Sequence, residues 1–294
     1  MLVEENLFGR RDKVQVAIER LRAFEPPEGY YVAFSGGKDS QTIYHLCKDA
    51  GVKFDAHYNL TTVDPPELVY FIRRQYPEVI ISYPSTSMWR LIEKKGMPPT
   101  RLVRYCCSTF KEYNGIGRIV VTGVRWAEST RRKNNRGLLE LNTYGNTIKD
   151  RVILHNDNDD ARQLFETCIM KGKHILNPII DWLNEDVWEY LNGKGIPHCC
   201  LYDCGFHRIG CIGCPMAGTK GMLAEFERYP QYYGAYLRAF DRMLWMRRDN
   251  GKPYTHWHTA QDVMDWWIYG QEKKTAIDEN QLSLFEGGDE LETD

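Results

Sequence analysis

Six consecutive residues near the start of the chain combine the side chains and the backbone freedom that phosphate binding needs. They are Ser35, Gly36, Gly37, Lys38, Asp39 and Ser40. The apolar residues 30–34 predict a strand before them, and residues 41–50 predict a helix after them. The glycines let the backbone approach phosphate oxygens closely, and the free N–H groups of the helix start attract an anion. Lys38 adds a positive charge, the serines add hydroxyls, and Asp39 is suited to assist Mg²⁺ or to cap the helix.

These six residues do not form a Walker A loop, because the pattern G-x-x-x-x-G-K-[ST] is absent. They resemble the PP-loop of ATP pyrophosphatases. Those enzymes cleave ATP between the α- and β-phosphates and give an adenylated intermediate and pyrophosphate. The alternative is an ordinary glycine turn that matches all six residues by chance.

Two pairs of cysteines form a second candidate site. Cys106 and Cys107 are adjacent, and Cys211 and Cys214 form a C-x₂-C turn that is separated from them by 103 residues. Four thiolates are the ligand set of a [4Fe–4S] cluster and also of a Cys₄ zinc site. Adjacent cysteines point poorly at one tetrahedral ion, which favours the cluster, but unligated buried cysteines also stay open. Three further cysteines are close enough in sequence to act as alternative ligands or sulfur carriers: Cys199, Cys200 and Cys204.

The composition indicates a globular protein, with 43% hydrophobic and 27% charged residues among 294. No run of about 18 apolar residues predicts a membrane helix, and the acidic start lacks a signal-peptide core. We therefore expect a cytoplasmic protein without a membrane partner, in which nine cysteines serve metal binding or catalysis before disulfides. Residues 271–294 carry a net charge of −6, so the preceding body is weakly basic, which permits contact with a polyanion.

Alternating strands and helices predict an α/β fold with an open parallel sheet flanked by helices. Strands are expected at residues 30–34, 54–60, 79–83, 119–124 and 175–180, and helices at 10–24, 41–50, 65–76, 87–95 and 184–192, with Asn184 as an N-cap. The predicted organisation is an N-terminal helix (1–27), a PP-loop domain (28–196), a cysteine-rich loop with a helical region (197–270) and a disordered acidic tail (271–294). Ligands of such sheets bind at the carboxyl ends of the strands, where residues 35–40 lie.

Several motifs together resemble the phosphoadenosine phosphosulfate reductase family of the adenine nucleotide alpha-hydrolase-like superfamily. Besides the loop and the cysteines, they are Lys111, the run from Gly123 through Arg125 to Ser129, residues 177–182, residues 186–188, and Arg208 before Cys211. The resemblance implies that Cys106, Cys107, Cys211 and Cys214 bind a [4Fe–4S] cluster next to the nucleotide site. It also implies that Gly123 adjoins the nucleotide, that Arg125 acts with Lys38 and Asp39 in catalysis, and that Arg131 and Arg132 lie near phosphates. Asp64 and Glu67 are candidates for ribose or metal contact.

Two departures from the reductases point to ATP as the substrate. No cysteine follows Cys214, so the C-terminal Glu-Cys-Gly-Leu-His motif of the reductases is missing, and the loop is the lysine- and aspartate-bearing type. The nearest analogues are then the ATP pyrophosphatase components of DNA phosphorothioation systems and the iron–sulfur tRNA thiolases. We therefore expect an adenylating enzyme that uses ATP and Mg²⁺ in sulfur transfer to a nucleic acid, with a cysteine desulfurase as sulfur donor.

The acidic tail contains a short sequence that resembles sliding-clamp docking peptides of bacterial DNA-processing proteins. Its residues are Gln281, Leu282, Ser283, Leu284 and Phe285. A disordered strand can present its apolar side chains to pockets on a partner, which favours DNA over tRNA as acceptor. Two other hypotheses stay open: a reductase of adenylyl sulfate that uses Cys199, Cys200 or Cys204, and a clamp-tethered nucleotide-binding module without turnover.

Overall fold

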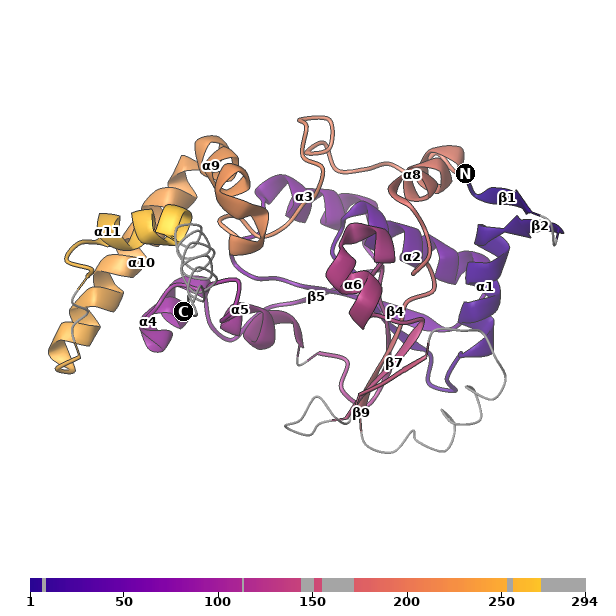
Figure 1. Cartoon of the computed structure of the whole chain (residues 1–294), viewed down its shortest axis with the longest axis horizontal. Helices are drawn as coiled ribbons and strands as arrows, with labels where there is room; N and C mark the ends of the chain where they lie inside the picture. Colours follow the sequence, from indigo (N-terminus) through magenta and orange to yellow (C-terminus); the bar gives the residue numbers. More distant parts are fainter. Residues whose placement is uncertain (7–8, 113, 144–150, 155–171, 253–255, 271–294) are drawn as a thin grey trace, which may run out of the picture. The chain divides into compact units, whose positions relative to one another are not determined.

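The chain folds into two compact units in the computed structural model, which describes residues 1–6, 9–112, 114–143, 151–154, 172–252 and 256–270 (Figure 1). Unit 1 comprises residues 1–60, 65–83 and 111–209, and unit 2 comprises residues 61–64, 84–110 and the described residues from 210 onward. Each unit has its own apolar core. Residues 84–110 therefore pack with the C-terminal helices, whereas the cysteine-rich residues 197–209 belong to unit 1.

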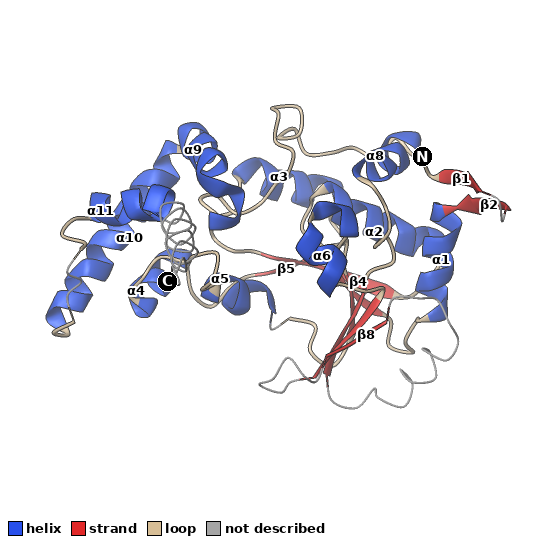
Figure 2. Ribbon diagram, viewed as in Figure 1, coloured by secondary structure: helices blue, strands red, loops and turns tan. Residues whose placement is uncertain are grey.

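Unit 1 is built on a seven-stranded sheet (Figure 2). The spatial order is β5 (Ile80–Ser82), β4 (Phe54–Asn59), β3 (Tyr30–Ala33), β6 (Ile119–Val121), β9 (Gly172–Leu176), β7 (Leu139–Thr143) and β8 (Arg151–Leu154). The first five strands pair in parallel. The predicted α/β fold with an open, mostly parallel sheet is confirmed.

The helices of unit 1 are α1 (Lys13–Ala23), α2 (Lys38–Ala50), α3 (Pro66–Gln75), α6 (Thr130–Asn135) and α8 (Asn184–Gly193). All of them except the polar α6 contribute side chains to the apolar core around the sheet. In β3, Tyr30, Tyr31 and Val32 are all buried, as expected for a parallel strand that is covered on both faces. Leu21 of α1, Leu46 of α2 and Leu191 of α8 join the same core. The α8 helix begins at Asn184, as the predicted range 184–192 has it, but the predicted N-cap is wrong, because Leu183 and not Asn184 is the N-cap.

The strand order reverses between β3 and β6. The chain runs from β3 outward through β4 to β5, and it then returns to build β6 and β9 on the other side of β3. Crevices at such a switch point are the usual ligand sites of open α/β sheets. The loop after β3 and the segment after β6 therefore meet where a ligand is expected.

The far edge of the sheet is antiparallel, which the sequence analysis did not predict. Strand β7 pairs antiparallel with both β9 and β8. Residues 139–142 alternate leucine with polar residues, a two-residue period that could have indicated β7. The strand expected at residues 175–180 is wrong beyond Leu176, because the chain turns there at Pro178, which has no N–H for a ladder.

Unit 2 is helical. Its helices are α4 (Met88–Lys95), α5 (Tyr105–Cys107), α9 (Gly218–Arg228), α10 (Pro230–Asp249) and α11 (Ala260–Asp265). Aromatic side chains form its core, where the rings of Tyr236 and Trp267 lie 4.8 Å apart between centroids. Among the described residues, no helix has the length and apolar character that a membrane crossing requires. The acidic tail with its docking sequence at residues 281–285 lies outside the described residues.

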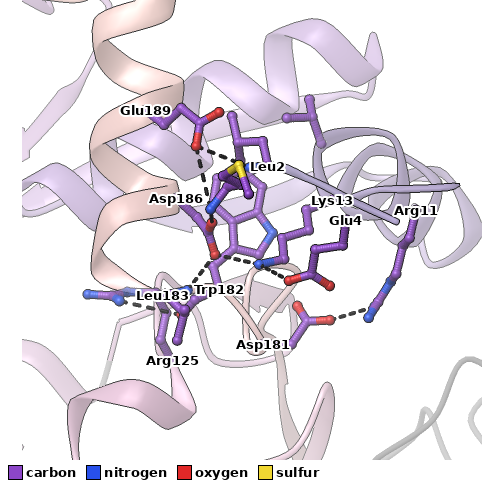
Figure 3. A network of polar contacts seen from close by, with 12 residues as sticks. Leu2, Glu4, Arg11, Lys13, Arg125, Asp181, Trp182, Leu183, Asp186 and Glu189 are labelled. Atoms are coloured by element: carbon purple, nitrogen blue, oxygen red, sulfur yellow. Dashed lines mark hydrogen bonds and ion pairs between the residues drawn. The ribbon is translucent and has the colours of Figure 1, made fainter. Parts of the chain in front are cut away.

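A network of ion pairs ties the N-terminal segment of unit 1 to α8 and to the loop before it (Figure 3). The N-terminal segment contains a two-stranded hairpin, β1 (Val3–Asn6) and β2 (Gly9–Asp12), which leads into α1. Lys13 donates to Asp186 at 2.7 Å and to Glu4 at 2.6 Å, and Lys13 and Asp186 are 4% and 0% exposed. Burial opposes ionisation of Asp186, but hydrogen bonds from Lys13 and from the Leu183 N–H still hold its pKa below the usual value.

We expect Lys13→Met to lower the free energy of unfolding by about 3 kcal/mol, because it leaves the buried Asp186 carboxylate without its main counter-charge. Lys48→Met is the matched control, since Lys48 forms an exposed ion pair with Glu78 at 2.9 Å and should lose less than about 1 kcal/mol. Urea unfolding of both variants measures the difference. Equal losses would show that the buried pair stabilises the fold no more than the exposed pair does.

Candidate active site

The loop between β3 and α2 has a conformation that only glycine tolerates. Gly36 has φ +70°, and a Cβ at this position would lie 2.7 Å from Ile72 Cδ1 and 2.8 Å from Leu68 Cδ1. Gly37 is extended and caps α2 without a side chain. The hydroxyl of Ser40 holds the turn, because it accepts from the Ser35 N–H at 3.1 Å and donates to the Gly37 carbonyl at 2.9 Å. The serines thus shape the loop that presents the start of α2.

Three predicted catalytic side chains meet at this helix start. The Asp39 carboxylate contacts Lys38 Nζ at 3.0 Å with one oxygen and Arg125 Nε at 2.8 Å with the other. Lys38 and Arg125 are buried, and Arg125 also donates to the Trp182 carbonyl at 3.5 Å and, through its backbone N–H, to Glu128 at 3.0 Å. One carboxylate therefore neutralises one of two buried positive charges, which leaves a site that favours an anion.

Gly123 supports the same arrangement from the neighbouring strand. It follows β6, and a Cβ there would lie 2.9 Å from the backbone of Asp39. Only a glycine lets the segment after β6 approach the first turn of α2 so closely. Gly123 therefore has a steric role beside the loop, and its contact with a nucleotide stays a prediction.

Further arginines lie close to Arg132, whose guanidinium also interacts with Asp39. Burial lowers the pKa of Arg132, and the positive charges of Arg208 and Arg136 add to that effect, with Asp39 acting against it. Arg132 pairs with Glu128, and Arg136 pairs with Glu140 at 2.7 Å. The side chain of Arg131 lies outside what the structure describes. Mutual repulsion among guanidinium groups is relieved when a polyanion binds, so this side of the loop suits phosphate or sulfate groups.

Tyr202 is a site residue that the sequence analysis missed. Its hydroxyl accepts a hydrogen bond from the Lys38 backbone N–H at 2.9 Å, where a phosphate oxygen is expected, and its ring packs edge-on against Trp188. Burial raises the pKa of Tyr202, so the phenol stays neutral. A tyrosine in a cysteine-rich loop, 164 residues from its partner, carries no sequence signal for this role.

The cysteines of that loop differ in accessibility. Cys199 is buried, and burial raises the pKa of its thiol to about 11, whereas Cys200 and Cys204 are exposed. Asp64 accepts from the Thr61 N–H within a turn of unit 2, so its carboxylate holds backbone. Glu67 lies in the first turn of α3 in unit 1.

The four predicted cluster cysteines gather in unit 2. A hydrogen bond with Cys107, burial, and the charges of Cys107, Cys211 and Cys214 raise the pKa of Cys106, so the four thiols share one neighbourhood. Cys106 and Cys107 lie on α5, and Cys211 and Cys214 flank a turn in which Gly213 has φ +71°. Within the described residues, no three Cys, His, Asp or Glu side chains converge tightly enough to hold one metal ion.

Polar groups of unit 2 surround these sulfur atoms. Arg104 Nη2 donates to Cys107 Sγ at 3.3 Å, and the Thr61 hydroxyl lies 3.4 Å from Cys211 Sγ. Tyr236 lies beneath the C-x₂-C turn and donates to the Ile212 carbonyl at 2.9 Å. Hydrogen bonds of this kind orient thiolate ligands and stabilise their charge.

Comparison with known proteins assigns the family. Residues 29–217 match the phosphoadenosine phosphosulfate reductase domain, which is more than half of the chain, and the chain therefore belongs to this family. The family expected from the motifs is confirmed. No described feature singles out one branch of it.

The relatives differ in size from this chain. An uncharacterised protein of Methanocaldococcus jannaschii is 26% identical over 218 residues, which cover 71% of this chain and 47% of the relative. A second uncharacterised protein of that organism is 29% identical over 225 residues, which cover 71% of this chain and 41% of the relative. The chain thus spans less than half the length of these two curated relatives. A probable FAD synthase of Schizosaccharomyces pombe is 23% identical, and the match covers 85% of this chain and 84% of that protein. A crystal structure of phosphoadenylyl-sulfate reductase from Candida auris aligns with a TM-score of 0.43 and 18% identity, covering 66% of this chain and 87% of the other.

We expect Gly123→Ala to destabilise unit 1 by about 2 kcal/mol and to abolish nucleotide binding, because the new Cβ displaces Asp39 and the start of α2. Gly193→Ala in α8 is the control, since nothing lies within 4 Å of a Cβ there. Thermal unfolding and nucleotide binding by calorimetry measure both effects. Wild-type nucleotide affinity in Gly123→Ala would contradict this account of the loop.

Proposed function

We propose that this protein binds ATP at the loop after β3 and cleaves it between the α- and β-phosphates, adenylating an acceptor for sulfur transfer to a nucleic acid. The observation that carries this proposal is the Lys38–Asp39–Arg125 arrangement at the start of α2. Buried cations and helix N–H groups are suited to the charge that develops on departing pyrophosphate. The surrounding arginines extend the same positive field.

In the proposed reaction, an acceptor oxygen attacks the α-phosphorus of ATP. The bond from that phosphorus to the oxygen bridging toward the β-phosphate breaks, and pyrophosphate leaves with the electron pair. Lys38 and the first amides of α2 stabilise the leaving charge, while Arg125 holds Asp39 in place. When the nucleotide binds, a phosphate oxygen replaces the Tyr202 hydroxyl as the acceptor of the hydrogen bond from the Lys38 backbone N–H.

The proposed ATP cleavage calls for Mg²⁺, and the residues at the loop fit that ion. Asp39 offers half-buried carboxylate oxygens, each of which keeps a lone pair beyond its contact with Lys38 or Arg125. One carboxylate together with phosphate oxygens is a common ligand set for Mg²⁺. The ion would neutralise the phosphates that Lys38 also contacts.

Sulfur transfer completes the proposed reaction. A cysteine desulfurase supplies a persulfide on a carrier cysteine, and the terminal sulfur of that persulfide displaces AMP from the adenylated acceptor. A second thiolate then attacks the sulfur of the carrier cysteine, which breaks the remaining S–S bond and leaves a disulfide between the carrier and the second cysteine. The exposed thiols Cys200 and Cys204 lie in the same turn as Tyr202, which contacts the loop. DNA is the acceptor we favour over tRNA, on the pattern of DNA phosphorothioation, and Gln281–Phe285 would dock the protein on a sliding clamp.

Cys106, Cys107, Cys211 and Cys214 would hold a [4Fe–4S] cluster. Their four thiols gather in one neighbourhood without forming the tight set that a single ion needs. A cubane cluster binds each cysteine to a separate iron, so its ligands can be spread more widely than those of one tetrahedral ion. Such a cluster would supply a structural and electrostatic anchor for unit 2.

A second candidate function, reduction of adenylyl sulfate, is favoured by the exposed thiols of Cys200 and Cys204 in the turn that contacts the loop. The buried Cys199, whose thiol has a raised pKa, is the least suited of the three to act as nucleophile. Sulfite release from adenylyl sulfate in the presence of thioredoxin would identify this activity.

Lys38→Ala should lower the formation of AMP and pyrophosphate from ATP at least about 100-fold without unfolding the chain, because it removes a charge that the leaving pyrophosphate needs. Lys48→Ala, on the exposed side of the same helix, should retain wild-type turnover. The assay is run anaerobically with DNA, tRNA or adenylyl sulfate, and the additive that stimulates AMP formation identifies the acceptor. Substantial turnover by Lys38→Ala would refute the assignment.

Cys211→Ser should reduce the iron and acid-labile sulfide of anaerobically purified protein to a small fraction of the wild-type content. Cys200→Ser, an exposed cysteine of unit 1, should leave both unchanged. Metal analysis and visible absorption measure the difference. Stoichiometric zinc without sulfide in the wild-type protein would replace the cluster with a Cys₄ zinc site.

A further inference from the structure

Two segments of unit 2 meet beside the gathered cysteines. Arg101 Nε donates to the Pro215 carbonyl at 3.0 Å, and this hydrogen bond joins residues 101–104 to residues 215–219. We call the two joined segments the Leu102 patch. They expose three large apolar side chains: Leu102, Val103 and Met216. Leu102 is 94% exposed, and apolar groups that gather on one surface in this way mark an interaction site.

The charge around the Leu102 patch is positive. Residues 96–107 and 214–224 contain three basic residues and no acidic one. All three basic residues are exposed: Arg101, Arg104 and Lys220. Arg104 also donates to Cys107 Sγ at 3.3 Å, so the patch reaches the edge of the cysteine site. An apolar surface with a basic rim is complementary to a partner that is both apolar and acidic.

The last described residues of the chain lie next to this patch. The Ile268 carbonyl accepts from the Thr219 hydroxyl at 2.8 Å, and Trp267 Nε1 donates to the Pro99 carbonyl at 2.6 Å. Thr219 belongs to the patch, and Pro99 precedes it by two residues. Residues 271–294 therefore leave unit 2 directly beside the patch.

The chain beyond Gly270 has both properties that the patch selects. Residues 275–294 contain seven acidic residues and no basic one, and they include the apolar side chains of the predicted docking sequence at 281–285. Leu282 is the twelfth residue after Gly270, and a chain of that length can span up to about 40 Å. A segment attached so close to its target has an effective concentration there on the order of millimolar, so even a weak contact is populated.

We propose that residues 275–294 dock on the Leu102 patch of the same chain, with Leu282, Leu284 and Phe285 on its apolar side chains and the flanking carboxylates on its basic rim. Docking shields the edge of the cysteine site from solvent. The same three side chains are those that a sliding clamp would bind, so docking on the patch and binding to a clamp exclude each other. This inference goes beyond the proposed function and does not depend on the ATP chemistry or on the acceptor.

Hydrogen exchange of the full chain tests whether the patch is covered. The comparison is with one triple substitution, the tail variant: Leu282→Ser, Leu284→Ser and Phe285→Ser. Residues 101–104 should exchange about tenfold more slowly in the wild-type protein than in the tail variant, whereas α1 should exchange equally in both. Equal exchange of residues 101–104 would overturn the proposal. Protection that increases with protein concentration would place the segment on a second copy and overturn it as well.

A fluorescent synthetic peptide of residues 275–294 tests the chemistry of the contact. It should bind the tail variant, whose patch is vacant, about tenfold more tightly than the wild-type chain, whose own segment competes. Leu102→Asp, added to the tail variant, should weaken peptide binding about tenfold, because an apolar contact is lost. Trp245→Asp is the matched control, since it replaces another exposed apolar side chain of unit 2 outside the patch, and it should change binding less than about twofold.

Two results of the peptide experiment would contradict the proposal: no binding to the tail variant, or equal losses in Leu102→Asp and Trp245→Asp. Thermal unfolding of every variant separates lost binding from lost folding.

Discussion

The Asp39 carboxylate, held between Lys38 and Arg125, is the interaction on which the loop site depends. Two cations this close repel each other, and their removal from water is costly unless a carboxylate lies between them. Asp39 is placed by the first turn of α2, and Arg125 is placed by the segment after β6. Gly123 permits this approach because any larger side chain would collide with Asp39. The reversal of strand order between β3 and β6 is thus the feature that creates the site.

The N-terminal segment supports the same site, although it precedes the residues that match the family domain. Asp181 accepts ion pairs from Arg20 and Arg11, at 2.9 and 2.7 Å, and Asp186 accepts from Lys13. Between these carboxylates lies Trp182, whose carbonyl contacts Arg125, as Figure 3 shows. Residues 1–28 precede the family match, yet they hold the loop that supports a buried arginine of the site. This gives a physical reason for an N-terminal helix and hairpin in this chain.

Unit 2 is built from segments that lie far apart in the sequence. Residues 61–64 form a turn against the Cys211 region, with the Val63 carbonyl accepting from the Ile212 N–H at 2.8 Å. Thr62 has φ +67°, a conformation that β-branched residues rarely adopt, and its hydroxyl accepts from the Met88 N–H at 2.9 Å. Strain of this kind persists only where surrounding contacts enforce it, and here it lies beside the gathered cysteines.

The sequence by itself determined the local features. Residues 35–40 predicted the phosphate loop, and hydrophobic periodicity predicted β3, β4, α2 and α3, because backbone preferences and amphipathic spacing act over a few residues. The antiparallel strand β7 was not predicted, because its pairing joins distant segments and its local two-residue period is weak. The tertiary structure alone decided that Arg125 reaches Asp39 across 86 residues, that Tyr202 covers the Lys38 amide, and that four cysteines share one neighbourhood. Such contacts are set by strand order and packing, which no local pattern encodes.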